Sequence, residues 1–404
     1  MRKILFVDDE PNVLNGLRRM LRGLRDEWDM QFAGSGAEAL QIMDKQPIDI
    51  IVTDIRMPHM DGAQLLTEVM KHHPQTVRIA LSGHSDKETI LRAVKPAHQY
   101  LSKPCEAEHL KVTVARAFAM RDLMRDDLIK ERVSQIDSLP SLPTLYFQIV
   151  DELQSEDCSV QKIGEIISKD PAMSAKILKI VNSSFFGLPR RVTDPVHAVK
   201  VLGLDTIKSL VLTVEVFSQF ESSSQATVQI ESFWHHSFLT GTIAKEISRK
   251  SDFPLQIVDA AFIGGLLHDI GKLVLAVNMA EIYKSVADYA NAQQCTLYDA
   301  ELYRLGVSHA EVGAYLLGLW GLPNAVIDAV RYHHSPLNCE NLTFSSLTAV
   351  HSANALSSPS GQEDATSSTA GGINLEYLTA VDAIDRLPEW REISKAQTEK
   401  EMVV

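Results

Sequence analysis

The first hundred residues alternate between two patterns of apolar and polar positions. Short apolar runs of strand length stand at residues 3–7, 48–53, 77–81 and 99–102, and apolar side chains recur every three or four positions between them. The segment after the first run shows the second pattern, with Val13, Leu14, Leu17, Met20, Leu21 and Leu24. This alternation predicts an α/β fold, a doubly wound parallel sheet of five strands.

A long helical segment is expected to follow, beginning near Glu106. No Gly or Pro interrupts the chain from there to Pro140, so the helix should continue past the first domain, residues 1–122, into a signalling linker, residues 123–138. Its apolar positions keep no regular heptad, which argues against a coiled coil but leaves a homodimer open.

The pattern after the linker is helical almost throughout and nowhere alternates with period two, so we expect an all-α domain at residues 139–355. Asp170-Pro171 and Gly203 are predicted to separate helices. Residues 356–404 should form a Ser- and Gly-rich loop and then a last helix, near residues 375–387, that packs back on this domain.

Length and charge limit the number of domains and the partners we expect. A chain of 404 residues is too long for one ordinary core. The net charge of −13 is concentrated beyond residue 125 and disfavours general nucleic-acid binding. No apolar run approaches the roughly twenty residues that span a bilayer. The first apolar run is also too short for a signal peptide. We therefore expect a cytoplasmic protein. Four widely spaced cysteines favour reduced thiols.

Acidic residues follow two of the predicted strands. Asp8 and Asp9 end the first run, and Asp54 ends the run at residues 48–53. In a parallel sheet these ends lie side by side, and three carboxylates in one pocket repel each other unless a hard cation joins them. The sequence therefore predicts a Mg²⁺ site, the alternative being an acid-lined loop without chemistry.

Ser82 and Lys103 follow two further strands, and together with the three acids they resemble the flavodoxin-like receiver domain of two-component response regulators. The resemblance implies that Asp54 accepts a phosphoryl group from a sensor histidine kinase. It implies further roles for seven residues. Asp9, Asp54 and the backbone carbonyl of Arg56 would bind Mg²⁺, with Asp8 acting through water. Ser82 and Lys103 would contact the phosphoryl group, and Tyr100 would change its rotamer. It also implies a cis Lys103-Pro104 bond.

The segments at residues 168–187 and 198–204 resemble the HDOD output module, which is related to the HD superfamily of metal-dependent phosphohydrolases. Several imidazoles and one carboxylate from separate helices suit a transition-metal centre. The resemblance places six residues of this HD-like domain at ligand positions: His236, His268, Asp269, His309, His333 and His334. We expect His268 and Asp269 inside one apolar helix.

Two departures from the enzyme pattern are visible. Asn354 stands where the superfamily has a metal-ligating Asp, and the residues after His334 lack the Gly-Tyr-Pro signature of cyclic-di-GMP phosphodiesterases. Three interpretations stay open: a hydrogen-bonded histidine scaffold without metal, a non-catalytic site for Mn, Fe or Mg, and an active phosphohydrolase. Five other histidines should lie on the surface of the first domain: His59, His72, His73, His84 and His98.

We therefore expect a response regulator in which phosphorylation of Asp54 changes what the HDOD module binds, its partner being an unidentified protein. The rival hypothesis is a phosphorylation-gated phosphohydrolase, acting on a cyclic dinucleotide or another phosphoester. A third is nucleotide sensing without turnover.

Overall fold

A computed structural model describes residues 2–83, 96–103, 105, 107–123, 144–153, 155, 158–182, 192–218, 227–251, 253–357 and 372–402. The chain divides into two compact units, the first built mainly from residues 1–144 and the second mainly from the rest. Four predicted features lie outside the described residues: the linker at 124–138, Pro104, the end of the 168–187 motif, and the loop at 358–371.

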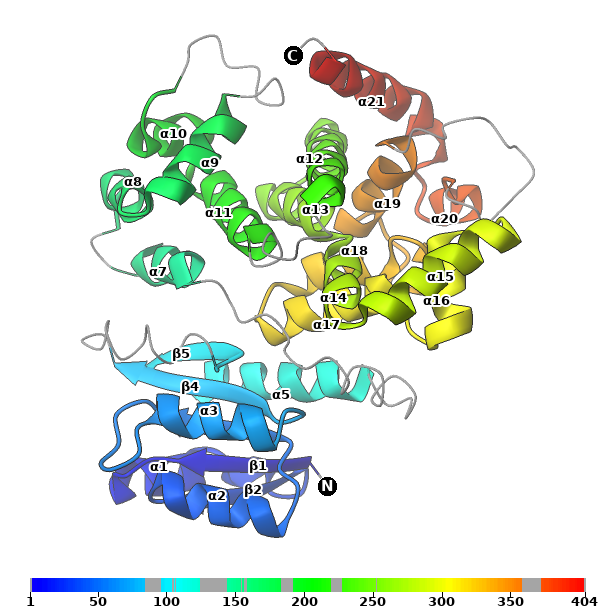
Figure 1. The fold of residues 1–404 in the computed structure, drawn as a ribbon. Coiled ribbons are helices and arrows are strands. Elements are labelled where there is room, and N and C mark those ends of the chain that lie inside the picture. The colour runs from blue at the N-terminus through cyan, green and yellow to red at the C-terminus, as the bar shows by residue number, and fades with distance from the viewer. Residues whose placement is uncertain are drawn as a thin grey trace. The chain divides into compact units, whose positions relative to one another are not determined.

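The first unit contains a parallel sheet whose described strands run in the order β2-β1-β3-β4-β5 (Figure 1). Apolar residues dominate the central strands because both faces of the sheet are covered. The doubly wound α/β fold expected from the sequence is confirmed. The strands are β1 (Arg2–Val7), β2 (Trp28–Ala33), β3 (Ile50–Asp54), β4 (Val77–Gly83) and β5 (Gln99–Lys103).

Alternate residues of β1 enter different cores. Ile4 joins the core that holds Leu14 of α1, whereas its neighbour Leu5 joins the core that holds Leu65 of α3. The helices of this unit are α1 (Pro11–Met20), α2 (Gly36–Lys45), α3 (Gly62–His72) and α5 (Ala107–Leu123), with a 3₁₀ turn at Arg22–Leu24.

The rest of the described chain is helical, as the sequence predicted. Its helices are α7 (Thr144–Leu153), α8 (Val160–Ser168), α9 (Pro171–Val181), α10 (Pro195–Leu202), α11 (Leu204–Ser218), α12 (Thr227–Lys250), α13 (Leu255–Leu267), α14 (Ile270–Asn278), α15 (Ala280–Gln293), α16 (Leu297–Leu305), α17 (His309–Leu319), α18 (Asn324–Tyr332), α19 (Ser346–Ser357), α20 (Leu375–Ala380) and α21 (Leu387–Met402), with 3₁₀ turns at Pro336–Asn338 and Ile384–Arg386.

Local sequence signals explain where several helices begin. The side chain of Asp170 accepts a hydrogen bond from the backbone N–H of Met173, and Pro171 starts α9. Gly203 separates α10 from α11 with a φ of 82°, a backbone conformation that favours glycine. The predicted breaks at Asp170-Pro171 and Gly203 are therefore confirmed.

The prediction of one helix near residues 375–387 is wrong. Helix α20 ends at Ala380, Asp382 adopts a left-handed φ of 54°, and a separate long helix, α21, begins at Leu387. The prediction that the C-terminal helix packs back is supported, because Trp390 of α21 is fully buried in one core with Ile243 of α12.

The prediction that His98 lies on the surface is also wrong. His98 is 4% exposed, and its Nδ1 accepts a hydrogen bond from the backbone N–H of Arg78 at 3.1 Å. His98 directly precedes β5, and its ring satisfies a backbone donor of β4, which offsets the cost of its burial. Of the others, His59 and His72 are exposed, His73 is half-buried, and His84 lies outside the described residues.

Helices α13 and α14 together contain a stretch long and apolar enough to cross a membrane. This stretch, Leu255–Asn278, has a mean hydropathy of 1.6, but 78% of its most apolar window is buried inside the fold. Burial within a helical core accounts for such apolar character. The stretch is also not one continuous helix, since α13 ends at Leu267 and α14 begins at Ile270.

Candidate functional site

Two pockets contain the candidate residues, and each belongs to one unit. The first, which we call the acidic pocket, consists of Asp8, Asp9, Asp54 and Lys103. In the parallel pairing of β1 with β3, Val7 lies beside Thr53, so the acids that follow both residues meet at one edge of the sheet. One carboxylate oxygen from each of Asp8, Asp9 and Asp54 lies within 4.8 Å of the others.

Lys103 provides the positive charge of this pocket. Its Nζ lies 2.8 Å from Asp8 Oδ2 and 2.9 Å from Asp54 Oδ1. Burial raises the pKa of Asp54, even though Lys103 acts in the opposite direction. Burial lowers the pKa of Lys103, but the hydrogen bonds to Asp8 and Asp54 outweigh it and leave this pKa raised.

The loop after β3 approaches the acidic pocket closely. Gly62 donates its backbone N–H to the carbonyl oxygen of Ile55 at 2.8 Å. A Cβ at Gly62 would collide with the carbonyl oxygen of Asp54, so only glycine allows this approach. Asp61 and Gln64 then cap α3 reciprocally, which anchors the loop to the helix.

Several roles predicted for this pocket stay predictions. The backbone of Ser82 lies in β4 and that of Tyr100 in β5, but neither side chain is among those described. Arg56 follows Asp54 by two residues and its side chain is exposed, while Mg²⁺ ligation by its carbonyl oxygen is a further prediction.

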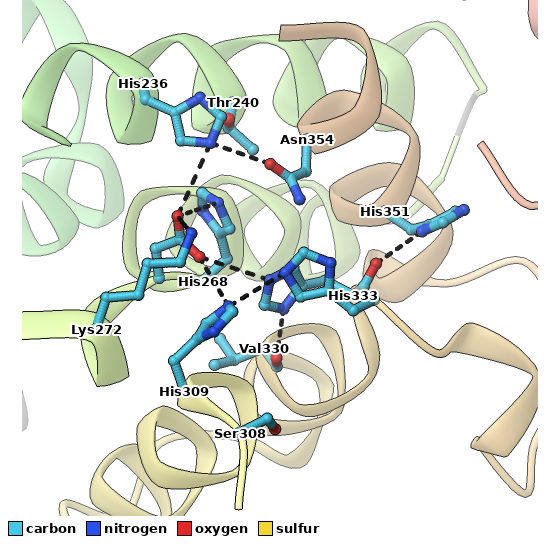
Figure 2. Close-up of polar contacts among 12 residues, drawn as sticks. His236, Thr240, His268, Lys272, Ser308, His309, Val330, His333, His351 and Asn354 are labelled. Atoms are coloured by element: carbon cyan, nitrogen blue, oxygen red, sulfur yellow. Dashed lines mark hydrogen bonds and ion pairs between the residues drawn. The ribbon is translucent and has the colours of Figure 1, made fainter. Parts of the chain in front are cut away.

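The second pocket, the histidine pocket, gathers its residues from separate helices (Figure 2). His236 lies in α12, His309 begins α17 and Asn354 lies in α19, while His333 and His334 directly follow α18. His268 and Asp269 occupy the break between α13 and α14. The prediction of one uninterrupted helix there is wrong, because the chain turns at these two residues and aims both side chains into the pocket.

Asp269 lies at the centre of the histidine pocket. Its Oδ1 is 3.2 Å from His309 Nε2 and 3.7 Å from His333 Nε2. Its Oδ2 is 3.3 Å from His268 Nε2 and 2.6 Å from Lys272 Nζ. Burial opposes ionisation of this carboxyl, but His268 and Lys272 hold its pKa well below the usual range.

Two of the rings are fixed by backbone carbonyl groups. His268 Nδ1 lies 2.8 Å from the carbonyl oxygen of Gly265, and His333 Nδ1 lies 2.6 Å from that of Val330. A carbonyl oxygen only accepts, so each Nδ1 carries a proton and each ring turns its Nε2 toward Asp269. Burial, above all, lowers the pKa of His333 to about 3 and keeps it neutral.

A carboxylate fixes the third ring, and sequence reasoning missed it. Glu301 in α16 is fully buried, and its Oε2 lies 2.6 Å from His309 Nδ1. Tyr283 donates to the other carboxylate oxygen at 2.6 Å. Burial lowers the pKa of His309, but Glu301 outweighs this effect and leaves the pKa raised. Nothing in the helical pattern distinguishes Glu301 from an exposed acid.

His351 was not a candidate either, and it supports the pocket from outside. Its Nδ1 donates to the carbonyl oxygen of His333 at 2.7 Å, and its Nε2 accepts the backbone N–H of Asn374 at 2.9 Å. Both ring nitrogens are therefore used, and His351 holds the peptide of His333 in place (Figure 2).

The donor atoms form two groups that share Asp269. One contains Asp269, His309, His333 and His334, the other His236, His268 and Asp269, and in each the ligand atoms lie within 4.8 Å of one another. Within the part of the chain that the structure describes, His268 Nε2, His333 Nε2 and Asp269 Oδ1 are buried and make no hydrogen bond. Imidazole nitrogens with a carboxylate are the donors that transition metals prefer, so these residues fit such an ion.

A cavity of about 330 Å³ adjoins the histidine pocket. Its wall includes His333, His334 and Asn354, and most of its other side chains are neutral and polar. Its volume is at the lower end of the range in which proteins bind small molecules. The other lining residues are Thr296, Tyr298, Asp299, Ser335, Leu337, Asn338, His351, Ala355, Gly372 and Asn374.

Comparison with known proteins assigns both regions. The model of the response regulator receiver domain matches residues 4–115, and the model of the HDOD domain matches residues 139–336. The crystal structure of an HDOD domain protein with unknown function from Geobacter sulfurreducens covers 67% of this chain and 97% of its own, with a TM-score of 0.50 and 21% identity. That likeness shows a shared fold.

Two curated relatives match parts of the chain. An uncharacterized protein of Treponema pallidum is 29% identical over 201 residues, 50% of this chain and 38% of that protein. The hydrogenase transcriptional regulatory protein HoxA of Cupriavidus necator is 37% identical over 125 residues, 30% of this chain and 25% of that protein. The chain thus spans well under half the length of either relative.

Proposed function

We propose that this chain, in which residues 4–115 match the receiver domain and residues 139–336 match the HDOD domain, is a two-component response regulator. In this proposal, phosphoryl transfer to Asp54 controls what the HDOD domain binds. The observation that supports this is the position of Lys103, within 2.9 Å of Asp54 and 2.8 Å of Asp8. A carboxylate that attacks a phosphoryl group needs cations to neutralise the oxygens of the transition state.

Two cations meet that need in our proposal. Lys103 supplies one, and Mg²⁺ held by Asp9, Asp54 and the carbonyl of Arg56, with Asp8 acting through water, supplies the other. The phosphoryl group adds about two negative charges at one spot. Ser82 and Tyr100 respond to that charge, and the donor is a sensor histidine kinase in the cytoplasm.

Labelling with radioactive acetyl phosphate tests this proposal. We expect Mg²⁺-dependent incorporation into the full chain and none into Asp54→Asn. The matched control is Asp44→Asn, since Asp44 is an acid of α2 with a side chain 75% exposed. Equal labelling of wild type and Asp54→Asn would place the phosphoryl group elsewhere.

For the histidine pocket we propose a divalent transition metal and an output through protein contacts. Asp269, His309, His333 and His334 would hold the ion, which when bound supplies a Lewis acid. Three buried atoms, His268 Nε2, His333 Nε2 and Asp269 Oδ1, make no hydrogen bond among the described residues. They support this proposal, because an uncompensated buried polar atom is unfavourable.

The second candidate function is phosphoester hydrolysis at the same pocket, and the adjoining cavity favours it. Replacing both His268 and Asp269 with Ala should abolish output if hydrolysis is the activity. A folded double variant that still signals would support protein contact instead. Nucleotide sensing without turnover is tested by calorimetry with cyclic-di-GMP, where heat of binding without product would support it.

A further inference from the structure

The two halves of the histidine pocket are not equivalent. Asp269 Oδ1 faces His309 and His333, whereas Asp269 Oδ2 faces His268 at 3.3 Å and His236 at 3.9 Å. A carboxylate with donors on both sides is the arrangement that could join two metal ions. Whether each half accepts an ion depends on what already occupies its donor atoms.

The half around Oδ1 offers four donors, and a metal ion would have to displace only the proton shared between His309 Nε2 and His334 Nε2. Asp269 Oδ1 and His333 Nε2 make no hydrogen bond to any described residue. His309 Nε2 lies 3.1 Å from His334 Nε2, and His309 Nδ1 is held by Glu301. This half therefore offers three imidazoles and a carboxylate.

The half around Oδ2 already contains a cation. Lys272 Nζ lies 2.6 Å from Asp269 Oδ2, and this carboxylate is only 4% exposed. A second metal ion would have to displace the ammonium group or remain beside it, and repulsion between like charges is strong where water is excluded. Lys272 thus supplies the positive charge that a second ion would bring.

A hydrogen bond to Asn354 engages another potential metal ligand of that half, His236. His236 Nε2 lies 3.0 Å from Asn354 Oδ1, an oxygen that only accepts, so His236 Nε2 carries the proton and has no lone pair for a metal. Figure 2 shows this contact at the edge of the pocket away from His309. As a neutral amide, Asn354 also adds no charge to balance a divalent ion.

From these contacts we infer that the histidine pocket binds one metal ion, with Lys272 and Asn354 excluding a second from the half formed by His236 and His268. The inference rests on the proposed metal binding. Its consequence is chemical: a pocket with one ion lacks the paired metals that clamp the attacking and leaving oxygens in two-metal hydrolysis. One ion also suits a role in joining the three parts of the chain that supply these ligands: the break between α13 and α14, the start of α17 and the end of α18.

Titration of the full-length protein with Co²⁺ tests this inference. Chelator-treated protein is titrated in excess Mg²⁺, which fills the oxygen-rich receiver site, and bound Co²⁺ is counted from its visible absorption and by elemental analysis. We expect one equivalent for wild type and two for Lys272→Met/Asn354→Asp. The matched control, Lys284→Met/Asn291→Asp, changes exposed residues of α15 and should bind one.

The outcomes separate the inference from the proposal on which it rests. Two equivalents in the wild type would overturn the inference and leave metal binding standing, whereas no bound Co²⁺ would overturn both. A folded double variant that still binds one equivalent would remove Lys272 and Asn354 as the cause. Circular dichroism checks folding, and if the double variant does not fold, Asn354→Asp alone is expected to gain a second, weaker equivalent.

Discussion

The acidic pocket and the histidine pocket both place an aspartate against a lysine, but they shift the pKa values of the two carboxyl groups in opposite directions. Asp54 lies 2.9 Å from Lys103 with its side chain 13% exposed, and its pKa is raised by burial. Asp269 lies 2.6 Å from Lys272 with its side chain 4% exposed, and its pKa is well below the usual range. The more deeply buried acid is the more strongly ionised one.

The neighbours explain this difference. Asp54 shares its lysine with Asp8, whose negative charge raises the pKa of Asp54 further. Asp269 has Lys272 to itself and is surrounded by imidazole rings. The acidic pocket therefore presents a partly open carboxylate suited to attack, and the histidine pocket presents a closed carboxylate suited to hold an ion.

The largest expected effect comes from a glycine beside each pocket. A Cβ at Gly62 would meet the carbonyl oxygen of Asp54, and a Cβ at Gly271 would meet that of His309. Backbone cannot move aside as a flexible side chain does, so Gly62→Ala and Gly271→Ala should each destabilise one unit by about 2–4 kcal/mol. Calorimetry on the full chain should show one altered transition per variant, and a shift of both transitions by either variant would contradict independent pockets.

Replacing Lys103 should impair phosphorylation at the acidic pocket and leave metal binding at the histidine pocket unchanged. Lys103→Met is expected to slow labelling by acetyl phosphate about 100- to 1000-fold, since one charge that stabilises the transition state is lost. Metal binding to the histidine pocket should not change. Lys111→Met, at a half-buried lysine of α5, is the control, and an unaffected labelling rate in Lys103→Met would exclude the proposed role.

Glu215 is a buried acid whose pKa shows the effect of burial, and it therefore tests whether a neighbouring cation or burial determines the pKa of such an acid. It accepts the backbone N–H groups of Leu145 and Tyr146 at 3.2 and 3.0 Å, and burial raises its pKa to about 7. A pKa raised on folding favours the folded state at low pH, so this contribution is present below about pH 4.5 and is lost as the pH rises through about 7.

The expected loss of stability over that interval is about 3 kcal/mol. Denaturant unfolding of the helical unit at several pH values measures it, and Glu215→Gln should flatten the profile. The control is Glu281→Gln, at an exposed acid of α15. A Glu215→Gln profile as steep as that of wild type would assign the pH dependence to another group.

The smallest expected effect concerns Glu301. Glu301→Gln removes the charge that holds His309 Nδ1–H, and loss of such a supporting carboxylate typically weakens metal binding about 10- to 100-fold. The Co²⁺ titration measures this change, with labelling of Asp54 as an internal check on the other pocket. An unchanged affinity would mean that Glu301 supports the fold and not the ion.

The acidic pocket was largely predictable from sequence. Strand ends can be located in an apolar pattern, and the ends of parallel strands meet, so Asp8, Asp9, Asp54 and Lys103 could be placed together. The residues of the histidine pocket could be predicted but their arrangement could not, since they come from helices distant in sequence. The break at His268 and Asp269 was missed because the apolar pattern continues through it.

The amino-acid sequence alone determined the two domains and the residue types of both pockets, because hydrophobic periodicity and turn residues act over short stretches of chain. Three contacts were decided by the tertiary structure alone. Glu301 contacts His309 Nδ1, Asn354 accepts a hydrogen bond from His236, and Lys272 forms an ion pair with one oxygen of Asp269. These contacts depend on which nitrogen or oxygen faces which partner, and only the packing of helices distant in sequence decides that.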